Sequence, residues 1–478
     1  MNIGIISYIL CWVIQIEGLF FLLPSITGLL YKESTGWYFF AMSILCLMIG
    51  FVGTRKKPKS AVMYAKEGFI VVALSWIIVS MIGATPFWIS GEIPSYIDAW
   101  FETISGLTTT GASILSDVEA LSHSSLIWRC FTNWIGGMGV LVFILAILPL
   151  SGAYNMHIMK AESPGPSVGK LVPRVRDTAK ILYTIYISIT LVQLVLLLLT
   201  GMPLFDSLTL SFATAGTGGF AVKNSSIADY TMLQQGIISV FMILYGVNFG
   251  AYFLILNKKY KQGFAMEEVR WYFIIIAAAV LFIGWDIREG FDTLLESFHH
   301  ALFQVGTVIT TTGFSTVDFD LWSATSKTIL VILMFVGACA GSTGGGIKVS
   351  RFIIMFKTIK KEIAYYIHPR SVKKIQMDGK GVEHEVIRSV NVFLIAYILI
   401  FVGSVLIVSL DHKDLVTNFT AVAATFNNIG PGLAGVGPMA NFGHFSDLSK
   451  LVMMFDMLAG RLEIFPMLIL FAPSVWKK

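Results

Sequence analysis

Four short polar segments of the chain each end in glycine, and each lies between two long apolar stretches. Irregular backbone at membrane depth is tolerated where it lines a water-filled path. Backbone carbonyls can replace the water shell of a monovalent cation, and glycine permits the dihedral angles that turn them toward one axis. None of the four segments contains a carboxylate, which favours a monovalent over a divalent ion. They are Thr108-Thr109-Thr110-Gly111, Ala215-Gly216-Thr217-Gly218, Thr310-Thr311-Thr312-Gly313 and Asn427-Asn428-Ile429-Gly430.

The four segments are interpreted as copies of one repeat. Small residues also occur at tight contacts between membrane helices, which would explain a single Thr-Gly pair. However, residues 101–111 and 303–313 match along their length: an aromatic residue, Glu or Gln, Ser or Thr at the fifth place, then three threonines and glycine. The second copy shares Thr-Gly-Gly-Phe at 217–220, and the fourth is the most divergent. We predict four like-oriented units of helix, short re-entrant helix, extended segment and helix around one pore.

Composition requires that these units lie in a membrane. The chain of 478 residues is 55% hydrophobic and 13% charged, whereas soluble domains have about a quarter charged residues. Several apolar runs are long enough to cross a bilayer. We predict an all-α integral membrane protein with ten spans, two of them preceding the first repeat. The spans are expected near 4–31, 36–53, 66–89, 126–152, 181–201, 232–256, 271–287, 327–356, 391–410 and 449–474.

Charge predicts the orientation of the spans. Basic residues concentrate in the loops 54–60, 153–180, 257–270 and 348–388 and at the C-terminus, all on one face if ten helices alternate. That face is expected to be cytoplasmic, with both termini on it. The basic stretch from Lys357 to Lys380 is explained by attraction to anionic membrane lipid rather than to nucleic acid. Acids at the starts of the short helices suit helix N-termini on the outer face: Asp98, Asp206, Asp292 and Asp414.

Two features suggest a gate on the cytoplasmic side of the glycine segments. The stretch Gly341-Ser342-Thr343-Gly344-Gly345-Gly346 interrupts an apolar run, and each glycine costs a helix about 1 kcal/mol relative to alanine. It is either a kink with close packing or a flexible loop that blocks the path. Arg461 lies within the last span, where a charge is costly and faces a pore or a partner. It either pairs with Asp456 or Glu463 or forms a positive barrier. Arg129 is a further candidate, as a brace for a short helix.

Several longer motifs show a resemblance to a known family. They are Gly136-Gly137-Met138-Gly139 with Pro149-Leu150-Ser151-Gly152, the run Ala340 to Lys348, His368-Pro369-Arg370-Ser371-Val372, and Gly460-Arg461-Leu462-Glu463-Ile464-Phe465. Together with the four glycine segments, they resemble the TrkH/TrkG/KtrB/HKT superfamily of cation transporters over essentially the whole chain. The resemblance implies potassium uptake, a pseudo-fourfold pore, a homodimer, and a cytoplasmic ring of TrkA-type nucleotide-binding regulatory subunits. It also implies a bacterial inner membrane protein.

The resemblance assigns roles to residues as well. Glycine at all four segment positions favours potassium over sodium, and the 341–346 loop with Arg461 is the expected gate. The implied potassium-binding residues are Thr109, Thr110, Gly111, Gly216, Thr217, Gly218, Thr311, Thr312, Gly313, Asn428, Ile429 and Gly430. The expected divisions are 1–60 for the two extra helices and 61–160, 161–260, 261–365 and 366–478 for the four repeats.

Other functions are less consistent with the sequence. A secondary transporter coupled to protons or sodium stays open as an alternative, although inverted repeats are common among such proteins and these four units run parallel. An enzyme is not expected, because the sequence lacks a His-Glu-x-x-His zinc motif, a nucleophile elbow and a P-loop. No catalytic residues are therefore predicted, and K⁺ is expected as the transported ion.

Overall fold

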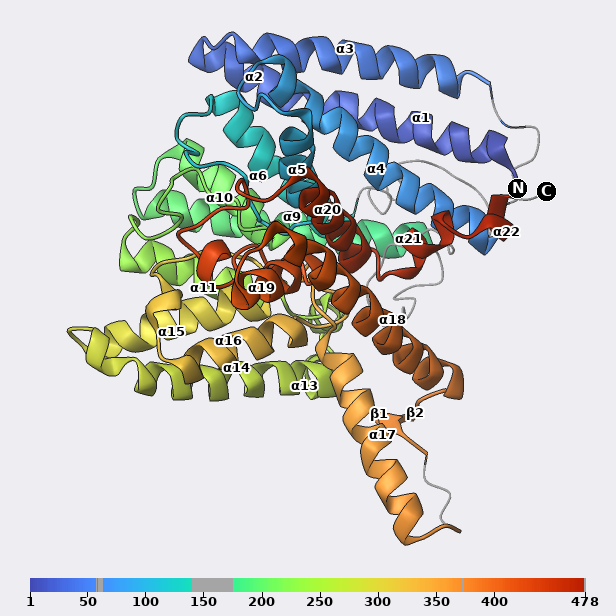
Figure 1. The fold of residues 1–478 in the computed structure, drawn as a ribbon, viewed down its shortest axis with the longest axis vertical. Helices are drawn as coiled ribbons and strands as arrows, with labels where there is room; N and C mark the ends of the chain where they lie inside the picture. Colours follow the sequence, from blue (N-terminus) through green and yellow to red (C-terminus); the bar gives the residue numbers. More distant parts are fainter. Residues whose placement is uncertain (57, 59–62, 140–174, 371–373, 477–478) are drawn as a thin grey trace.

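The computed structural model describes residues 1–478 except 57, 59–62, 140–174, 371–373 and 477–478. The described chain is almost entirely helical (Figure 1). Strands there are limited to a two-residue antiparallel hairpin of β1 (Gln376–Met377) and β2 (Lys380–Gly381). This agrees with the predicted all-helical membrane fold, apart from the small hairpin.

The N-terminal helices form a layer at one edge of the molecule. Helices α1 (Ile3–Phe20) and α2 (Leu22–Tyr31) lead into α3 (Thr35–Thr54), and α1 packs along α3 and α4. These helices are the blue elements at the top of Figure 1. Helices α1 and α2 together form one apolar span and α3 forms another, and these two correspond to the extra spans expected before the first repeat.

The rest of the chain repeats one order of elements four times. Each unit has a long helix, a short helix that we call the pore helix, an irregular segment and an inner helix. The first unit is α4 (Ala65–Ile89), α5 (Tyr96–Leu107) and α6 (His123–Met138). The second is α9 (Val175–Leu199), α10 (Leu204–Gly216) and α11 (Met232–Tyr245), followed by α12 (Phe249–Leu256) and α13 (Tyr260–Ala265).

The third and fourth units have the same order. The third contains α14 (Glu267–Asp286), η1 (Arg288–Gly290), α15 (Leu294–Ile309), η2 (Phe319–Leu321), α16 (Ala324–Val336) and α17 (Val349–Ile367). The fourth contains α18 (His384–Val408), η3 (Ser409–Asp411), α19 (Leu415–Phe426), η4 (Ala434–Val436), α20 (Asp447–Arg461), α21 (Phe465–Leu470) and α22 (Pro473–Trp476). We call the side where the pore helices begin the outer side.

Fewer unbroken spans are present than the ten expected. Within the described ranges, six helices are long and apolar enough to cross a membrane, and α11 with α12 adds a seventh if this pair, bent by 90°, is one span. The expected spans 327–356 and 449–474 are each divided, and α6 ends at Met138, with residues 140–152 outside the described part. The chain is therefore a multi-pass membrane protein whose inner helices are short.

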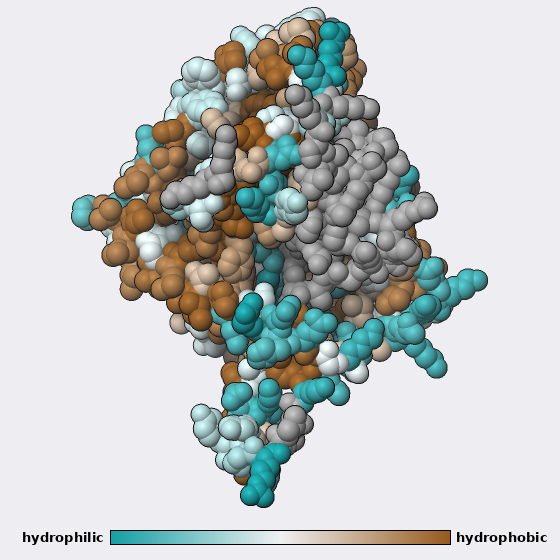
Figure 2. Space-filling model, turned by 90° about the vertical axis from the view of Figure 1, so that its right-hand side faces the viewer, coloured by the Kyte–Doolittle hydropathy of each residue, from teal (hydrophilic) through white to brown (hydrophobic). Residues whose placement is uncertain are grey.

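The surface is consistent with a lipid environment. Large apolar side chains are exposed along α3, α9, α14 and α18, which a soluble monomer would not tolerate over such an area. Figure 2 shows a broad hydrophobic area on one face, with hydrophilic residues gathered toward the protruding end. That end is the arm formed by α17 and the β1–β2 hairpin (Figure 1).

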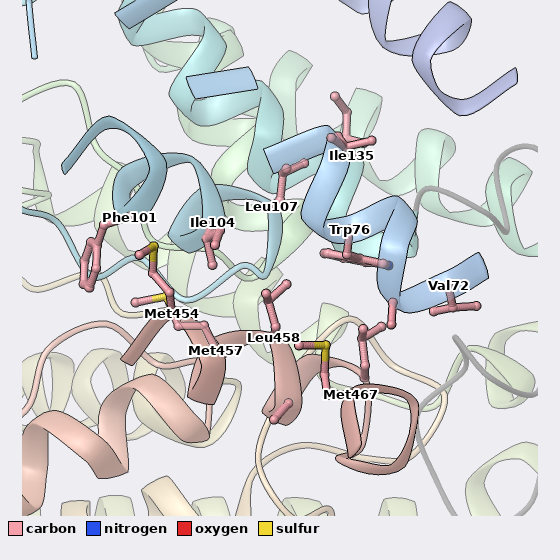
Figure 3. Packing of buried hydrophobic residues seen from close by; sticks show 14 of the residues in the cluster. Val72, Trp76, Phe101, Ile104, Leu107, Ile135, Met454, Met457, Leu458 and Met467 are labelled. Atoms are coloured by element: carbon pink, nitrogen blue, oxygen red, sulfur yellow. The ribbon is translucent and has the colours of Figure 1, made fainter. Parts of the chain in front are cut away.

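The core holds the first and fourth units together. Apolar side chains of α5 lie toward those of α20, while side chains of α4 and α21 extend the cluster to the right in this view (Figure 3). Methionines of α20 fill much of this contact, because their flexible thioethers adapt to irregular gaps. The labelled residues in this view are Val72, Trp76, Phe101, Ile104, Leu107, Ile135, Met454, Met457, Leu458 and Met467.

The acids at the starts of the pore helices have different roles. Asp414 caps α19, where it accepts the backbone N–H of Thr417 at 2.9 Å. Serine and threonine cap two of the others: Ser95 accepts from Asp98 in α5, and Thr293 caps α15. Asp98 instead pairs with Lys450 at 2.5 Å, which joins the first unit to the fourth.

Candidate functional site

All four pore helices end in the same backbone geometry. A residue at or just after each helix C-cap has a left-handed φ: 57° at Thr109, 52° at Thr217, 57° at Thr311 and 57° at Asn428. In each case its N–H donates to the carbonyl three residues earlier, and the following N–H donates to the carbonyl five residues earlier. This is the Schellman arrangement that satisfies the last carbonyls of a helix. The backbone therefore confirms four equivalent helix ends.

Threonine is an unusual residue at these positions. A β-branched side chain at positive φ is strained, and such strain persists where the surrounding structure over-determines it. The hydroxyl of Thr109 donates to the Thr108 carbonyl at 2.7 Å, and that of Thr217 donates to the Gly216 carbonyl at 2.6 Å. All four units thus share this geometry although it strains the backbone locally, which points to a function for the segments that follow.

The glycines that follow bring the four segments together in a closed ring. Gly111, Gly219, Gly313 and Gly430 have φ values of 80°, 72°, 91° and 98°. A methyl group on Gly111 would collide with the Gly218 carbonyl, one on Gly219 with that of Thr312, and one on Gly313 with that of Ile429. A methyl group on Gly430 would meet the Thr110 carbonyl, which returns to the first segment. Backbone thus lies against backbone in the cyclic order one, two, three, four.

The ring corrects the register of the second segment. The sequence alignment placed Gly218 opposite Gly111, but the dihedral angles and the contacts place Gly219 there, one residue later. We call the four equivalent stretches Thr109–Gly111, Thr217–Gly219, Thr311–Gly313 and Asn428–Gly430 the glycine segments. The match of Gly219-Phe220 to Gly313-Phe314 is the sequence signal that gives the correct register.

The ring opens to the outer side. A cavity of about 280 Å³ is lined by Gly111, Gly219, Gly313 and Gly430 together with residues of the loops that follow them. One residue from each unit therefore faces one shared space. An ion approaching from this side would meet all four segments at once.

A buried ion pair supports the ring from behind. The guanidinium of Arg129 donates to Glu102 Oε1 through Nε at 2.9 Å and Nη2 at 2.7 Å, and to the Ala221 carbonyl at 3.2 Å. Glu102 also accepts the Ile114 N–H at 3.0 Å, just after the first glycine segment. Arg129 thus braces the first and second segments, as its position suggested. Gln304 occupies the place of Glu102 in the third unit.

On the inner side the ring is covered by the stretch Gly337–Lys348, which we call the inner loop. Its two ends are joined by hydrogen bonds, including Ile347 N–H to the Phe335 carbonyl at 3.1 Å. Between them the loop approaches the glycine segments: the Gly345 N–H donates to Thr311 Oγ1 at 2.5 Å, and the Gly346 N–H donates to the Asn427 carbonyl at 3.1 Å. The interruption is therefore an ordered excursion beneath the ring and not a simple kink.

Arg461 connects the inner loop to another unit. Its Nη1 donates to the Thr343 carbonyl at 2.7 Å, and its Nη2 donates to the carbonyls of Gly136 and Gly137 at 2.5 and 2.7 Å. The two acids considered as its partners have contacts of their own. Glu463 pairs with Arg351 at 2.5 Å, and Asp456 accepts from Ser404 at 2.8 Å.

This membrane protein has a ring of four backbone segments with a cavity on the outer side, and a loop bound to the buried side chain of Arg461 on the inner side. These features are those of the class of cation transport proteins. The comparison with known proteins agrees. The TrkH family model, described as a cation transport protein, matches residues 36–287 and 291–478. The chain belongs to this family.

Individual relatives extend over the full length. "Trk system potassium uptake protein TrkH" of Salmonella typhimurium is 34% identical over 472 residues, with 96% of each chain covered. "Trk system potassium uptake protein TrkG" of Escherichia coli K12 is 34% identical over 484 residues, covering 100% of this chain and 99% of the relative. The crystal structure of the potassium transporter TrkH from Vibrio parahaemolyticus superposes with a TM-score of 0.89 at 32% identity, over 100% of both chains.

Proposed function

We propose that this protein takes up potassium as the membrane component of a Trk system, with the four glycine segments as its selectivity filter. The observation that carries the proposal is the closed ring, in which backbone of each of the four units lies against backbone of the next. The relatives named as potassium uptake proteins support the choice of ion. Carbonyl dipoles there replace the water shell of K⁺, and the inward carboxyl ends of four pore helices add partial negative charge.

The proposed ion-binding residues follow from the ring. They comprise the predicted set with Gly219 added as the counterpart of Gly111, and Gly216 retained as the carbonyl that precedes Thr217. A serine at one of the glycines would disturb the approach of neighbouring segments, so potassium selectivity depends on all four. K⁺ is the transported substrate, and no role for it as a cofactor is proposed.

The inner loop and Arg461 are proposed as the gate. Residues 341–346 lie against the inner end of the ring, and Arg461 adds a positive charge at the same level. Both features oppose the passage of a cation. Opening then requires that the loop leave its contacts with Thr311 and Asn427.

The wider assembly is also part of the proposal. The repeats occupy 61–160, 161–260, 261–365 and 366–478 in a pseudo-fourfold arrangement, with the two additional helices in 1–60. The protein forms a homodimer in the bacterial inner membrane, with both termini in the cytoplasm and a TrkA-type nucleotide-binding ring on that side. Membership of the Trk family supports the regulatory partner.

Flux measurements test the proposed function. Purified protein in liposomes should take up ⁸⁶Rb⁺, with unlabelled K⁺ competing and Na⁺ competing weakly. Gly313→Ser should weaken the discrimination between K⁺ and Na⁺, whereas Gly290→Ser should not, because the space around Gly290 is open. Absence of flux from folded protein, with every regulator and nucleotide condition tried, would refute the proposal. Proton- or sodium-dependent uptake would show that transport is coupled.

A further inference from the structure

Glu268, in the first turn of α14, contacts both ends of the inner loop. Its side chain is 3% exposed. One oxygen, Oε1, accepts the backbone N–H of Ala340 at 2.7 Å and that of Ser350 at 3.1 Å. Ala340 lies where the chain enters the loop, and Ser350 lies in the first turn of α17, just after the loop. A single carboxylate oxygen therefore fixes the entry and the exit of the loop.

These two bonds add a side-chain anchor to backbone bonds such as that from the Val349 N–H to the Ala338 carbonyl at 3.1 Å, which also joins the two ends of the loop. The Cys339 N–H donates to the Gly246 carbonyl at 3.0 Å, and the Gly341 carbonyl accepts from Phe249 at 3.0 Å. Each of these contacts reaches one point of the loop. Glu268 is placed to act on both ends together through one acceptor oxygen.

The preceding residue joins the same turn of α14 to the protruding arm. Glu267 pairs with Lys357 of α17 at 2.6 Å, and its backbone N–H donates to Asp378 Oδ1 at 2.6 Å. Lys357 also donates to the Gln376 carbonyl of β1 at 2.7 Å. The arm is therefore held at Glu267, and the loop is held at the next residue.

We propose that the first turn of α14 couples the protruding arm to the gate, with Glu268 as the positioning residue that keeps the inner loop closed and Glu267 as its link to the arm. A displacement of the arm that separates Lys357 from Glu267 releases the turn that carries Glu268. The loop then loses its common anchor at Ala340 and Ser350. This inference rests on the proposed function only where it calls the loop a gate.

The position of the loop can be measured without any flux assay. Cys339 is a fully buried free thiol at the entry of the loop, and Cys130 is a fully buried free thiol in α6. Reaction with N-ethylmaleimide, read for each cysteine by peptide mass spectrometry, reports the opening of the loop at Cys339. Cys130 reports general unfolding in the same molecules.

The variants are chosen to separate the hydrogen bonds from the charge. Glu268→Ala removes both bonds and should raise the labelling rate of Cys339 by at least about tenfold, with Cys130 unchanged. Glu268→Gln keeps a carbonyl oxygen where Oε1 accepts both N–H groups, so it should protect Cys339 nearly as well as the native residue. If Glu268→Ala fails to fold, Glu268→Asp, shorter by one methylene, should give an intermediate rate. The exposed carboxylate of Glu362 on α17 provides the control, Glu362→Ala.

A charge exchange tests the link to the arm. Lys357→Glu should raise Cys339 labelling, and the double variant Glu267→Lys with Lys357→Glu should restore protection. Unchanged Cys339 labelling in folded Glu268→Ala overturns the anchor, and unchanged labelling in Lys357→Glu overturns the coupling. Increased labelling without increased ⁸⁶Rb⁺ flux supports the anchor and refutes the gate in the proposed function. The two ideas therefore fail separately.

Discussion

Replacing Arg461 by methionine should increase the basal leak of the protein. Methionine retains an unbranched stem like that of arginine but lacks the guanidinium, so the change removes three hydrogen bonds to carbonyls at 2.5 to 2.7 Å. The bond to the Thr343 carbonyl joins Arg461 to the inner loop. A hydrogen bond to a charged group contributes about 1.5–3 kcal/mol. Each 1.4 kcal/mol changes an equilibrium constant about tenfold, so the population of the released loop relative to the closed loop should increase roughly 10- to 150-fold.

The expected flux follows from this shift. If the open state of the resting protein is populated at about 0.1%, the variant should reach about 1% or more. The assay is ⁸⁶Rb⁺ uptake into liposomes without any regulatory subunit. Arg288→Met serves as the control, because Arg288 is 37% exposed in an outer loop. Basal uptake equal to that of the native protein, in a folded variant, would refute the reasoning.

A lysine at the same position separates two roles of the guanidinium. Arg461→Lys keeps the positive charge but cannot reproduce a fork that reaches Thr343 and α6 together. If the bond to the loop dominates, this variant leaks more than the native protein. If the charge alone repels the ion, it stays as tight as the native protein.

Three further predictions concern the ring and its supports. Gly219→Ala should abolish selective ⁸⁶Rb⁺ uptake, because the residue has a φ of 72° and touches the next segment. Gly236→Ala on α11 is the control and should be tolerated, since the space around Gly236 is open. Normal uptake in Gly219→Ala would support the register expected from the sequence instead. Arg129→Leu should cost about 3–5 kcal/mol of stability by leaving the Glu102 carboxylate buried and unpaired. Thermal unfolding in detergent measures this, and adding Glu102→Gln should recover part of the loss. Hydrogen bonds from the hydroxyl and N–H of Thr417 lower the pKa of Asp414 below its usual 3.8. The ionised carboxylate therefore stabilises the folded protein fully above pH 3.8, and this stabilisation is lost as the pH falls through the lowered pKa. Unfolding of Asp414→Asn should therefore depend less on pH between about 4 and 2, and an unchanged pH dependence would exclude this role.

Local sequence signals were sufficient for much of the site. Threonine and glycine within an apolar background located all four segments, since polar backbone in a membrane requires a special environment. The run of glycines at 344–346 located the inner loop for the same reason. The register of the second segment was misjudged, because Gly218 and Gly219 are both glycine and the match of Gly219-Phe220 to Gly313-Phe314 was given less weight than the match of the Thr-Gly pairs.

The breaks in the inner helices could not be predicted in the same way. α11, α16 and α20 have 14, 13 and 15 residues and therefore similar lengths, but of these three the break after α16 is the one with a run of consecutive glycines. After α20 the chain turns at Glu463 and Ile464, with φ values of 58° and 70° that their residue types do not suggest. Composition therefore predicted continuous spans where the structure has divided ones.

The physical reason is that the breaks are stabilised by partners distant in sequence. A helix that ends inside a membrane leaves carbonyls that need donors. Here the Thr343 N–H donates to the Tyr245 carbonyl at 3.4 Å. Arg461 donates hydrogen bonds to the carbonyls of Gly136 and Gly137, which precede it by 325 and 324 residues. The inner loop and Arg461 thus satisfy helix ends that would otherwise be unpaired. If the inner loop is the gate that we propose, its opening exposes these carbonyls to the water that enters with the ion, which lowers the cost of breaking the contacts and allows one loop to close and release the path.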